Sequence, residues 1–305
     1  VTTAGCSATS ASTSVNVNPA PTALVTASGP TSFCQGGSVS FTANAGNGYT
    51  YLWSNGETTS SITSSITGNF TVTVSNQIGC STTSAVNAVV VNPIPVATIT
   101  AGGSTTICSG SPVSLSAPAG SNYLWNTGST SQSINAATAG NYTVVVTSAA
   151  GCSATSAPTT IMVNALPSAA ISSSGSTTFC QGATISLSTT GGLSSYLWST
   201  GETTSSLNVT TSGNYTVTVT NSNGCSATSS PTVVNVLTAP TALIYPGTNV
   251  NICAGSTVTL STGTAASYAW SNGANTPTIT VGANGTHTVT LTGSNGCTAT
   301  SAVST

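Results

Sequence analysis

Nine cysteines dominate the chemistry available to this chain of 305 residues. Cysteine thiols form disulfides, bind zinc as thiolates or act as nucleophiles. Zinc sites built from cysteine usually contain pairs of ligands only a few residues apart. No two cysteines here lie closer than 28 residues in the sequence. The spacing therefore favours disulfides, which form in an oxidising setting outside the cytoplasm.

The cysteines belong to an internal repeat. One set follows a glycine at the end of a turn such as "SNGC": Cys6, Cys80, Cys152, Cys225 and Cys297. A second set precedes a glycine by two positions, as in "FCQG": Cys34, Cys108, Cys180 and Cys253. Each second-set cysteine lies 28 residues after a turn cysteine, and 27 residues separate each tryptophan from the next turn cysteine. The junction between repeats therefore keeps one length.

The few titratable side chains do not form a catalytic arrangement. Glu57 and Glu202 occupy one turn position of alternate repeats, where Ser129 and Ala274 stand in the others. We interpret the glutamates as solvated turn residues. His287, the one histidine, stands where other repeats carry an aromatic residue, so we expect it to pack as a substitute for that ring: Phe70, Tyr142 and Tyr215. A Ser–His–acid triad cannot be assembled, because the chain has no Asp and both glutamates belong to other repeats than His287.

The composition excludes several classes of function. The chain has no Lys or Arg and only two acidic residues. Binding to nucleic acids and to anionic membrane surfaces depends on cationic side chains, so we expect neither partner. No stretch approaches the ~20 apolar residues of a membrane span, so we expect no direct membrane insertion. No signal peptide is visible and residue 1 already lies inside a repeat, which predicts an excerpt or a processed product.

Alternation of apolar and polar residues predicts short strands within each repeat. The segments "SVSFTA", "YTYLW" and "GNFTVTVSN" each turn one apolar face inward: Val39, Phe41, Ala43, Tyr51, Trp53, Phe70, Val72 and Val74. Asn-Gly after the tryptophan supplies a hairpin turn. Each repeat has one tryptophan, which we expect at the centre of its core: Trp53, Trp125, Trp198 and Trp270. Short strands, frequent turns and one buried tryptophan per ~73 residues predict an all-β sandwich.

The order of "G-x-x-V-x-L", "Y-x-W-S-N-G" and "G-N-Y-T-V-T-V-x-N-x-x-G" resembles a short immunoglobulin-like domain. With the cysteines in "C-x-G" and "N-G-C" and the abundant Thr and Ser, it resembles the tandem Ig-like or PKD-like repeats of large surface adhesins of Bacteroidota, such as gliding-motility adhesins exported by type 9 secretion. The resemblance covers the whole chain and implies tandem immunoglobulin-like β-sandwich repeats of ~73 residues. The expected domains are the last strand of a preceding repeat at 1–19 and four repeats at 20–93, 94–166, 167–239 and 240–305, the fourth without the end of its last strand.

The strands named by this resemblance constrain the disulfides. They place Cys34 in the turn before a strand of about seven residues and Cys80 at the opposite end of the sandwich, ~23 Å away, whereas a disulfide needs Cα atoms within ~7 Å. In a head-to-tail string these turns of successive repeats face each other, which implies Cys34–Cys152, Cys108–Cys225 and Cys180–Cys297. A different strand layout would allow pairs within each repeat: Cys34–Cys80, Cys108–Cys152, Cys180–Cys225 and Cys253–Cys297. The sequence leaves both schemes open.

The leading hypothesis is a structural segment of a long, disulfide-stabilised extracellular fibre or adhesin stalk on a bacterial surface. Its partners would be neighbouring repeats of the same chain, and we expect no enzyme activity, cofactor or metal. Alternatives are adhesive repeats that bind surface glycans or other cell-surface proteins, and spacer domains of a secreted enzyme. Five asparagines lie in N-x-T sequons, which are either glycosylation acceptors or plain turn and strand residues: Asn69, Asn141, Asn208, Asn214 and Asn284.

Overall fold

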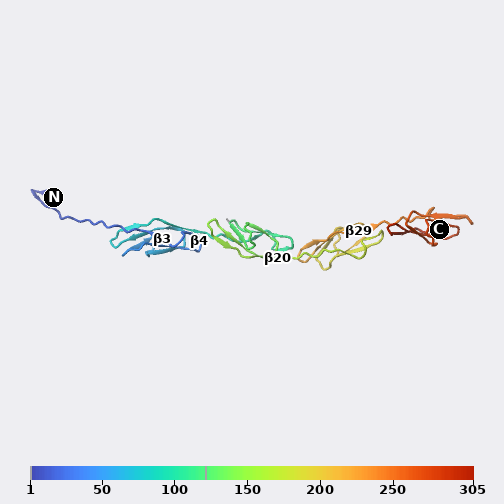
Figure 1. Ribbon diagram of the computed structural model, residues 1–305, viewed down its shortest axis with the longest axis horizontal. Helices are drawn as coiled ribbons and strands as arrows, with labels where there is room; N and C mark the ends of the chain where they lie inside the picture. The colour runs from blue at the N-terminus through green and yellow to red at the C-terminus, as the bar shows by residue number, and fades with distance from the viewer. Residues whose placement is uncertain (1, 121) are drawn as a thin grey trace. The chain divides into compact units, whose positions relative to one another are not determined.

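The computed structural model describes residues 2–120 and 122–305, and the described part contains strands and turns but no helix (Figure 1). The chain divides into two compact units, residues 1–163 and 164–305. Each unit contains two separate hydrophobic clusters. We refer to the stretches around the four clusters as repeats 1 to 4, in the order expected above. Their outer bounds remain predictions.

Repeat 1 shows the complete arrangement of strands. One sheet has the order β3-β5-β7. The opposite layer is built from two sheets of order β10-β9-β6 and β4-β11-β8. The strands are β3 (Val25–Ala27), β4 (Ser32–Cys34), β5 (Val39–Ala43), β6 (Thr50–Trp53), β7 (Ser61–Ser64), β8 (Gly68–Phe70), β9 (Val72–Ser75), β10 (Ser81–Thr83) and β11 (Asn87–Asn92). Two layers of short, mainly antiparallel strands form an immunoglobulin-like β-sandwich, so the expected fold is confirmed.

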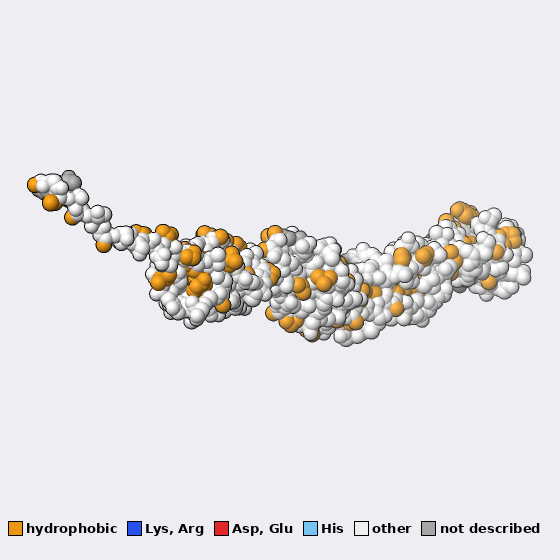
Figure 2. Space-filling view, turned by 60° about the vertical axis from the view of Figure 1, so that its left-hand side comes forward, with side chains coloured by type: hydrophobic (Ala, Val, Ile, Leu, Met, Phe, Trp, Pro, Cys, Tyr) orange, Lys and Arg blue, Asp and Glu red, His pale blue; other side chains and the backbone are white. Residues whose placement is uncertain are grey.

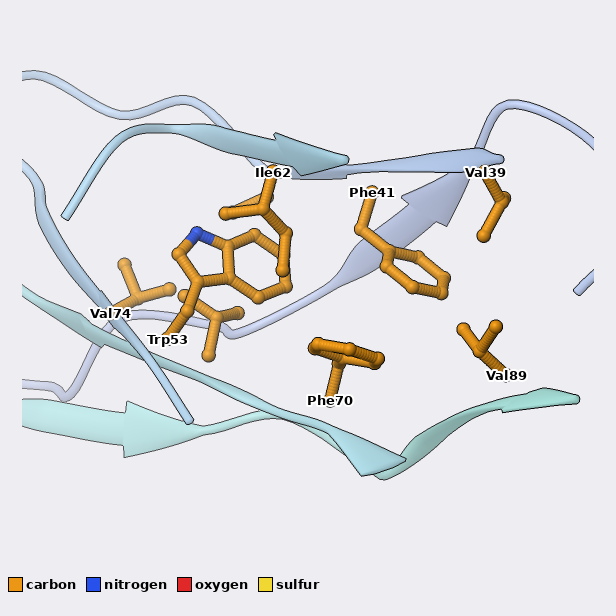
Figure 3. Packing of buried hydrophobic residues seen from close by; sticks show 9 residues of the cluster. Val39, Phe41, Trp53, Ile62, Phe70, Val74 and Val89 are labelled. Carbon is orange, nitrogen blue, oxygen red and sulfur yellow. The ribbon is translucent and has the colours of Figure 1, made fainter. Parts of the chain in front are cut away.

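The core of repeat 1 forms because alternate residues of each strand point between the layers. Phe41 and Ile62 come from the β3-β5-β7 sheet, and Trp53, Phe70 and Val74 come from the opposite layer (Figure 3). The centroids of the two phenyl rings lie 5.9 Å apart. Val89 of β11 closes one end of this core, beside Val39. The inward positions inferred from the alternation are therefore buried, except for Tyr51, which is half-buried and packs against the core.

A serine directly follows the β10-type strand of each repeat, and it is buried in repeats 2 to 4 and half-buried in repeat 1. In repeat 1, Ser84 stands between β10 and β11, its Oγ accepts a hydrogen bond from the backbone N–H of Val72 at 3.1 Å, and its own N–H donates to the carbonyl of Val72 at 2.9 Å. Ser156, Ser229 and Ser301 make the same bonds in the other repeats, at 3.1 Å from Oγ. The hydroxyl satisfies a backbone donor that the interrupted ladder would leave unpaired.

Repeats 2 and 3 reproduce this plan. Repeat 2 contains β12 (Thr100–Ala101), β13 (Thr106–Cys108), β14 (Val113–Ser116), β15 (Asn122–Trp125), β16 (Ser133–Ala136), β17 (Gly140–Tyr142), β18 (Val144–Thr147), β19 (Ser153–Thr155) and β20 (Thr159–Asn164). Repeat 3 contains β21 (Ser172–Ser173), β22 (Thr178–Cys180), β23 (Ile185–Ser188), β24 (Ser195–Trp198), β25 (Ser206–Val209), β26 (Gly213–Tyr215), β27 (Val217–Thr220), β28 (Ser226–Thr228) and β29 (Thr232–Leu237). Nine buried residues form each core, as in repeat 1.

Repeat 4 is less complete. Its strands are β30 (Val258–Ser261), β31 (Ser267–Trp270), β32 (Thr278–Val281), β33 (Val289–Thr292) and β34 (Thr298–Thr300). Its core has six buried residues. The described residues of this repeat supply no counterpart of β4 or β11, and only single bridges mark the neighbouring edges, at Tyr245–Ser261 and His287–Ser304. At the other end of the chain, β1 (Thr2–Thr3) and β2 (Cys6–Ser7) form a small hairpin.

The place expected for Cys34 needs a correction. It does not lie in a bare turn but ends β4, a strand that pairs in parallel with β11 so that Cys34 is opposite Asn92. The strand that follows, β5, has five residues instead of about seven. The separation from Cys80 comes from β10 and β11, which together run from Ser81 to Asn92, about 35 Å of extended chain. Cys34 and Cys80 therefore lie at opposite ends of the sandwich, as expected, but the length of β10 and β11 separates them, and not the length of β5.

Candidate functional site at the repeat junctions

We call β4, β13 and β22 the β4-type strands of repeats 1 to 3, and β11, β20 and β29 their β11-type strands. Two disulfides each join the β4-type strand of one repeat to a turn of the next repeat in the same unit. Cys34 is bonded to Cys152, with Cα atoms 5.6 Å apart and a sequence separation of 118. Cys180 is bonded to Cys297, also with Cα atoms 5.6 Å apart, across 117 residues. Both Cα separations lie in the range usual for disulfides. The junction between repeats is thus the chemically distinctive place in this molecule.

The turn that carries the second partner is built by a side chain. In repeat 1, Oδ1 of Asn76 accepts hydrogen bonds from the N–H groups of Ile78 at 3.2 Å and Cys80 at 3.0 Å. Gly79 has a φ of +87°, a conformation that other residues rarely adopt. In repeat 2 the serine hydroxyl of Ser148 takes the place of the asparagine and accepts from Cys152 N–H at 3.2 Å. The glycine before each turn cysteine therefore fixes the direction in which that cysteine leaves the turn.

The other partner is held by a parallel strand pair. In repeat 3 the pairing of β22 with β29 places Cys180 opposite Leu237, as Cys34 lies opposite Asn92 in repeat 1. Directly after the cysteine, Gln35 N–H donates to Asn92 O at 2.8 Å, and Gln181 N–H donates to Leu237 O at 2.8 Å. Strand pairing and this hydrogen bond therefore hold the last residue of the β11-type strand beside the cysteine.

The turn cysteine of the following repeat lies close to the carbonyl oxygen of that same last strand residue. Sγ of Cys152 is 3.9 Å from Asn92 O, and Sγ of Cys297 is 4.0 Å from Leu237 O. At each of these junctions the disulfide therefore runs beside the backbone that leaves one repeat for the next. The two repeats are joined twice at one place, once by the peptide chain and once by the disulfide.

Asparagine side chains add polar contacts to the linker. Nδ2 of Asn76 donates to Pro19 O at 3.4 Å, and Nδ2 of Asn295 donates to Thr238 O at 2.9 Å. Asn221 Nδ2 likewise donates to Ala165 O at 3.0 Å. In each case the acceptor is the residue directly after the end of a β11-type segment. The turn asparagine therefore shapes its own turn and also satisfies a carbonyl of the linker.

The structure does not form the pairs within a repeat. Cys34 and Cys152 are bonded to each other, as are Cys180 and Cys297, which leaves none of the pairs Cys34–Cys80, Cys108–Cys152, Cys180–Cys225 and Cys253–Cys297. Cys108 and Cys225 are not free thiols. Their expected bond to each other would join the two units and stays a prediction. The free thiols among the described residues are Cys6, Cys80 and Cys253.

Each tryptophan lies in the core of its repeat. The exposed fractions are 1% for Trp53, 1% for Trp125, 2% for Trp198 and 4% for Trp270. Every indole Nε1 donates at 2.8 Å to a backbone carbonyl six residues later, at Thr59, Ser131, Thr204 and Thr276. The ring is thus buried while its one polar atom is satisfied, which leaves no tryptophan face for stacking on a sugar.

The glutamates lie in exposed turns. Glu57 Oε1 accepts a hydrogen bond from Asn55 Nδ2 at 2.8 Å, and Glu202 is also exposed. No group of His, Cys, Asp or Glu in the described ranges is arranged to hold a metal ion. The five sequon asparagines are all exposed, and Asn141 accepts a hydrogen bond from Thr160. Their glycosylation stays a prediction.

His287 is less completely packed than we expected for a substitute of an aromatic residue. It takes the place of the aromatic residue, because its pairing with Ser304 matches that of Phe70 with Asn87. Phe70, however, is 6% exposed, whereas His287 is half-buried and borders a hollow of about 570 Å³. Its Nδ1 is buried without a hydrogen-bond partner. The imidazole ring is smaller than a phenol ring, and no β11-type strand covers it within the described residues.

The surface is almost free of charge. On the face visible in Figure 2, backbone and side chains that are neither charged nor hydrophobic predominate, and hydrophobic side chains lie in small scattered groups. The described residues include no helix long and apolar enough to span a membrane. Sequence reasoning missed the parallel strand at Cys34 and the contacts of the turn asparagines with the linker. The one available signal was Asn or Ser four residues before three of the turn cysteines, Cys80, Cys152 and Cys225.

No family model and no curated protein matches the chain. Among solved structures it is similar to the D1–D4 ectodomain fragment of ICAM-5, with 12% identity, a TM-score of 0.42, and 92% of this chain and 97% of that chain covered. It is also similar to the four N-terminal Ig domains of a Dscam1 isoform, with 12% identity, a TM-score of 0.22, and 90% of this chain and 95% of that chain covered. A third similar structure contains the three N-terminal domains of the outer capsid protein Hoc of bacteriophage RB49, with 18% identity, a TM-score of 0.29, and 71% of this chain and 99% of that chain covered. These similarities are too low to indicate function, and the fold rests on the strand pairing described above.

Proposed function

We propose that this chain is a structural segment of a long extracellular fibre or adhesin stalk on a bacterial surface. The observation that carries this proposal is the bond of Cys34 to Cys152 beside the linker at Asn92. Small contacts between domains normally permit hinge motion. A second covalent connection at the same junction opposes that motion and so suits a shaft that must transmit force or hold a distant tip.

Other properties support the same role. Disulfides of this kind persist in oxidising compartments, which supports an extracellular location. A chain without Lys or Arg offers no site to trypsin-like proteases, and its surface changes little with ionic strength. The resemblance to large adhesins of Bacteroidota supports a place on the cell surface of such bacteria, with type 9 secretion as the export route and gliding motility as one setting.

Reduction of the disulfides tests the proposal. Single molecules of the chain would be imaged by electron microscopy before and after treatment with a reductant, and the bend angles at the junctions measured. We expect a narrow distribution of angles in the oxidised protein and a broad one after reduction, with each repeat still folded. Equal distributions in both states would contradict a stiffening role.

A second candidate is adhesion through the exposed face of the β6-β9-β10 sheet. Leu52 is opposite Thr73, which is opposite Thr83, and Leu52 is 55% exposed. Repeats 2 and 3 expose leucines at the same position, Leu124 and Leu197. In repeat 3 Leu197 is likewise opposite Thr218, whereas in repeat 2 Leu124 is opposite Val145. This repeated exposed leucine and its neighbours could contact glycans or another cell-surface protein. Binding on a glycan array that is lost after Leu52→Ser, Leu124→Ser and Leu197→Ser would favour this candidate. An absence of binding would favour the structural role of a stalk segment.

A further inference from the structure

Asn-Gly pairs are a second kind of reactive group in this chain. The main-chain nitrogen of the residue after an asparagine can attack the carbonyl carbon of the asparagine side chain, and glycine has no Cβ to hinder that approach. All such pairs lie outside the strands, so the hydrogen bonds around each pair decide which one can react. The chain contains six of them: Asn47–Gly48, Asn55–Gly56, Asn223–Gly224, Asn272–Gly273, Asn284–Gly285 and Asn295–Gly296.

Four of these pairs lie in turns that the glycine itself closes. A nitrogen that donates a hydrogen bond across its turn cannot move towards the asparagine side chain until that bond breaks. The four glycine nitrogens are therefore protected. Each N–H donates to the main-chain carbonyl three residues earlier, at 2.9 or 3.0 Å: Gly56 to Trp53, Gly224 to Asn221, Gly273 to Trp270 and Gly296 to Gly293.

Hydrogen bonds also hold the side chains of three of these asparagines. Asn55 Nδ2 donates to Glu57 Oε1 at 2.8 Å, and Asn55 Oδ1 accepts from Glu57 N–H at 3.2 Å. Asn272 Oδ1 accepts from the N–H two residues later at 3.1 Å. Asn295 Nδ2 donates to Thr238 O at 2.9 Å. In these pairs the carbon that would be attacked is therefore held in place as well.

Asn47–Gly48 lacks both constraints. The pair lies in the loop between β5 and β6, and both residues are exposed. Within the part of the chain that the structure describes, no hydrogen bond engages Gly48 N–H or the side chain of Asn47. The bond that closes this turn runs from Tyr49 N–H to Gly46 O at 3.3 Å, longer than the usual ~2.9–3.0 Å. No hydrogen bond of the pair itself has to break before Gly48 N approaches the side chain.

The shape of this loop depends on its glycines. The φ angle of Gly48 is +67°, and a Cβ added there would run into the side chain of Gln77. A Cβ added at Gly46 would run into the ring of Tyr49. The missing Cβ of Gly48 therefore permits the turn and also leaves its nitrogen accessible. Repeats 2 to 4 have no Asn-Gly pair between the corresponding strands.

We propose that Asn47 is a site of self-modification. Gly48 N attacks Cγ of Asn47, a C–N bond forms, and the bond from Cγ to Nδ2 breaks. The proton of Gly48 N–H leaves with the side-chain amide as ammonia, and the product is a succinimide ring. Water then opens this ring. Cleavage at Cγ leaves aspartate, and cleavage at the main-chain carbonyl leaves isoaspartate. Water is the one co-reactant, and no electrons are transferred to or from another molecule.

The reaction places a carboxylate beside a turn that contacts the linker. Gln77, whose side chain lies against Gly48, follows Asn76, the residue that shapes this turn and donates to Pro19 O. The chain has only two acidic residues, so the product adds a third negative charge. Isoaspartate also adds one carbon to the main chain of the loop. Modification therefore changes the charge and the backbone of repeat 1 next to its linker contact, a property that goes beyond the proposed stalk and does not rest on it.

Incubation of the folded chain in mildly alkaline buffer tests the proposal, because such a buffer favours loss of the proton from nitrogen. Mass spectrometry after chymotryptic digestion measures the modified fraction at each pair, and methylation by an isoaspartate methyltransferase detects isoaspartate. We expect modification at Asn47 to be about tenfold faster than at the protected pairs, because each of those must first break a hydrogen bond. The protected pairs are those of Asn55, Asn223, Asn272 and Asn295. Asn284 borders the hollow of repeat 4 and takes no part in this comparison.

Two controls separate the fold from the dipeptide. In the chain unfolded by urea, Asn47 and the protected pairs should react at similar rates, because the turns are lost. Asn47→Gln should abolish modification in this loop, because the longer side chain would have to close a larger ring. Asn47 is exposed and makes no hydrogen bond in the described structure, so this variant should fold normally. Asn223→Gln, which removes a protected pair, should leave the release of ammonia from the folded chain nearly unchanged.

Equal rates at Asn47 and at the protected pairs of the folded chain would overturn the proposal. An Asn47 that stays unmodified in the folded chain, under conditions in which the unfolded chain reacts, would overturn it as well. Neither outcome alters the bond of Cys34 to Cys152 on which the stalk proposal rests.

Discussion

Cys152 lies 3.9 Å from the carbonyl oxygen of Asn92 while it is bonded to Cys34, so three segments of two repeats meet at one point. Asn92 ends the last strand of repeat 1, and Cys152 follows the turn between two strands of repeat 2. The disulfide and the peptide linker therefore act at the same place. Stiffness at this junction depends on both, which leads to the following expectations.

Removal of the disulfide should destabilise repeats 1 and 2. In the chain-entropy model a loop of more than a hundred residues is worth about 4–5 kcal/mol, which is an upper value because native strain subtracts from it. Cys34→Ser combined with Cys152→Ser should lower the Tm of these repeats in calorimetry. Cys80→Ser, which removes a free thiol, is the control and should leave the Tm unchanged. A double variant as stable as the parent would argue that the bond constrains nothing.

Trp53→Ala should cost about 3–5 kcal/mol of unfolding free energy, because it opens a cavity at the centre of the core. It also removes the donor to Thr59 O. Leu52→Ala, in the same strand but 55% exposed, should cost far less. Chemical denaturation followed by the fluorescence of the remaining tryptophans in the other repeats, together with circular dichroism, measures both. Similar losses for the two variants would place the core elsewhere.

Ser156→Ala should cost about 1–3 kcal/mol, because Val144 N–H would be left buried without its acceptor. The amide of Val144 should also exchange with solvent hydrogen faster in the variant. Ser153→Ala, at an exposed position of β19, is the matched control. Unchanged protection of Val144 would mean that the hydroxyl does not repair the interrupted ladder.

Gly151→Ala should cost about 1–2 kcal/mol, because φ at this position is +82°. An added Cβ would meet nothing within 4 Å, so the cost comes from the backbone alone. Gly151→Asn should be milder, since asparagine tolerates this conformation better than alanine. The rate at which Cys152 becomes oxidised during refolding, followed by thiol labelling, should fall in the same order. Equal rates in all three proteins would count against the turn as the element that aims Cys152.

Much of the fold could be predicted because its signals are local. Alternation along β9 is sufficient to turn Val72 and Val74 inward, and one buried tryptophan in every repeat marks the centre of a sandwich. The constant junction length also indicated where the repeats meet. These signals depend on spacing within a few residues or on exact repetition, both of which are visible in a single sequence.

The remaining features depend on contacts between distant segments. β4 has three residues and only Phe33 to mark its inner side, too short a run for any periodic signal. Its parallel partner β11 lies more than fifty residues away in the sequence. The incomplete packing of His287 depends on which strand covers it, not on its own neighbours in sequence. A pattern within one repeat could not reveal either relationship.

Peptide mapping of the intact chain without reduction is the most direct test of the central claim that the cysteines join successive repeats. Chymotrypsin suits a chain without Lys or Arg, and Cys80 blocked by an alkylating agent serves as an internal reference for a free thiol. We predict peptides that link Cys34 to Cys152, Cys108 to Cys225 and Cys180 to Cys297. Recovery of Cys34 linked to Cys80, or of Cys108 linked to Cys152, would contradict the account.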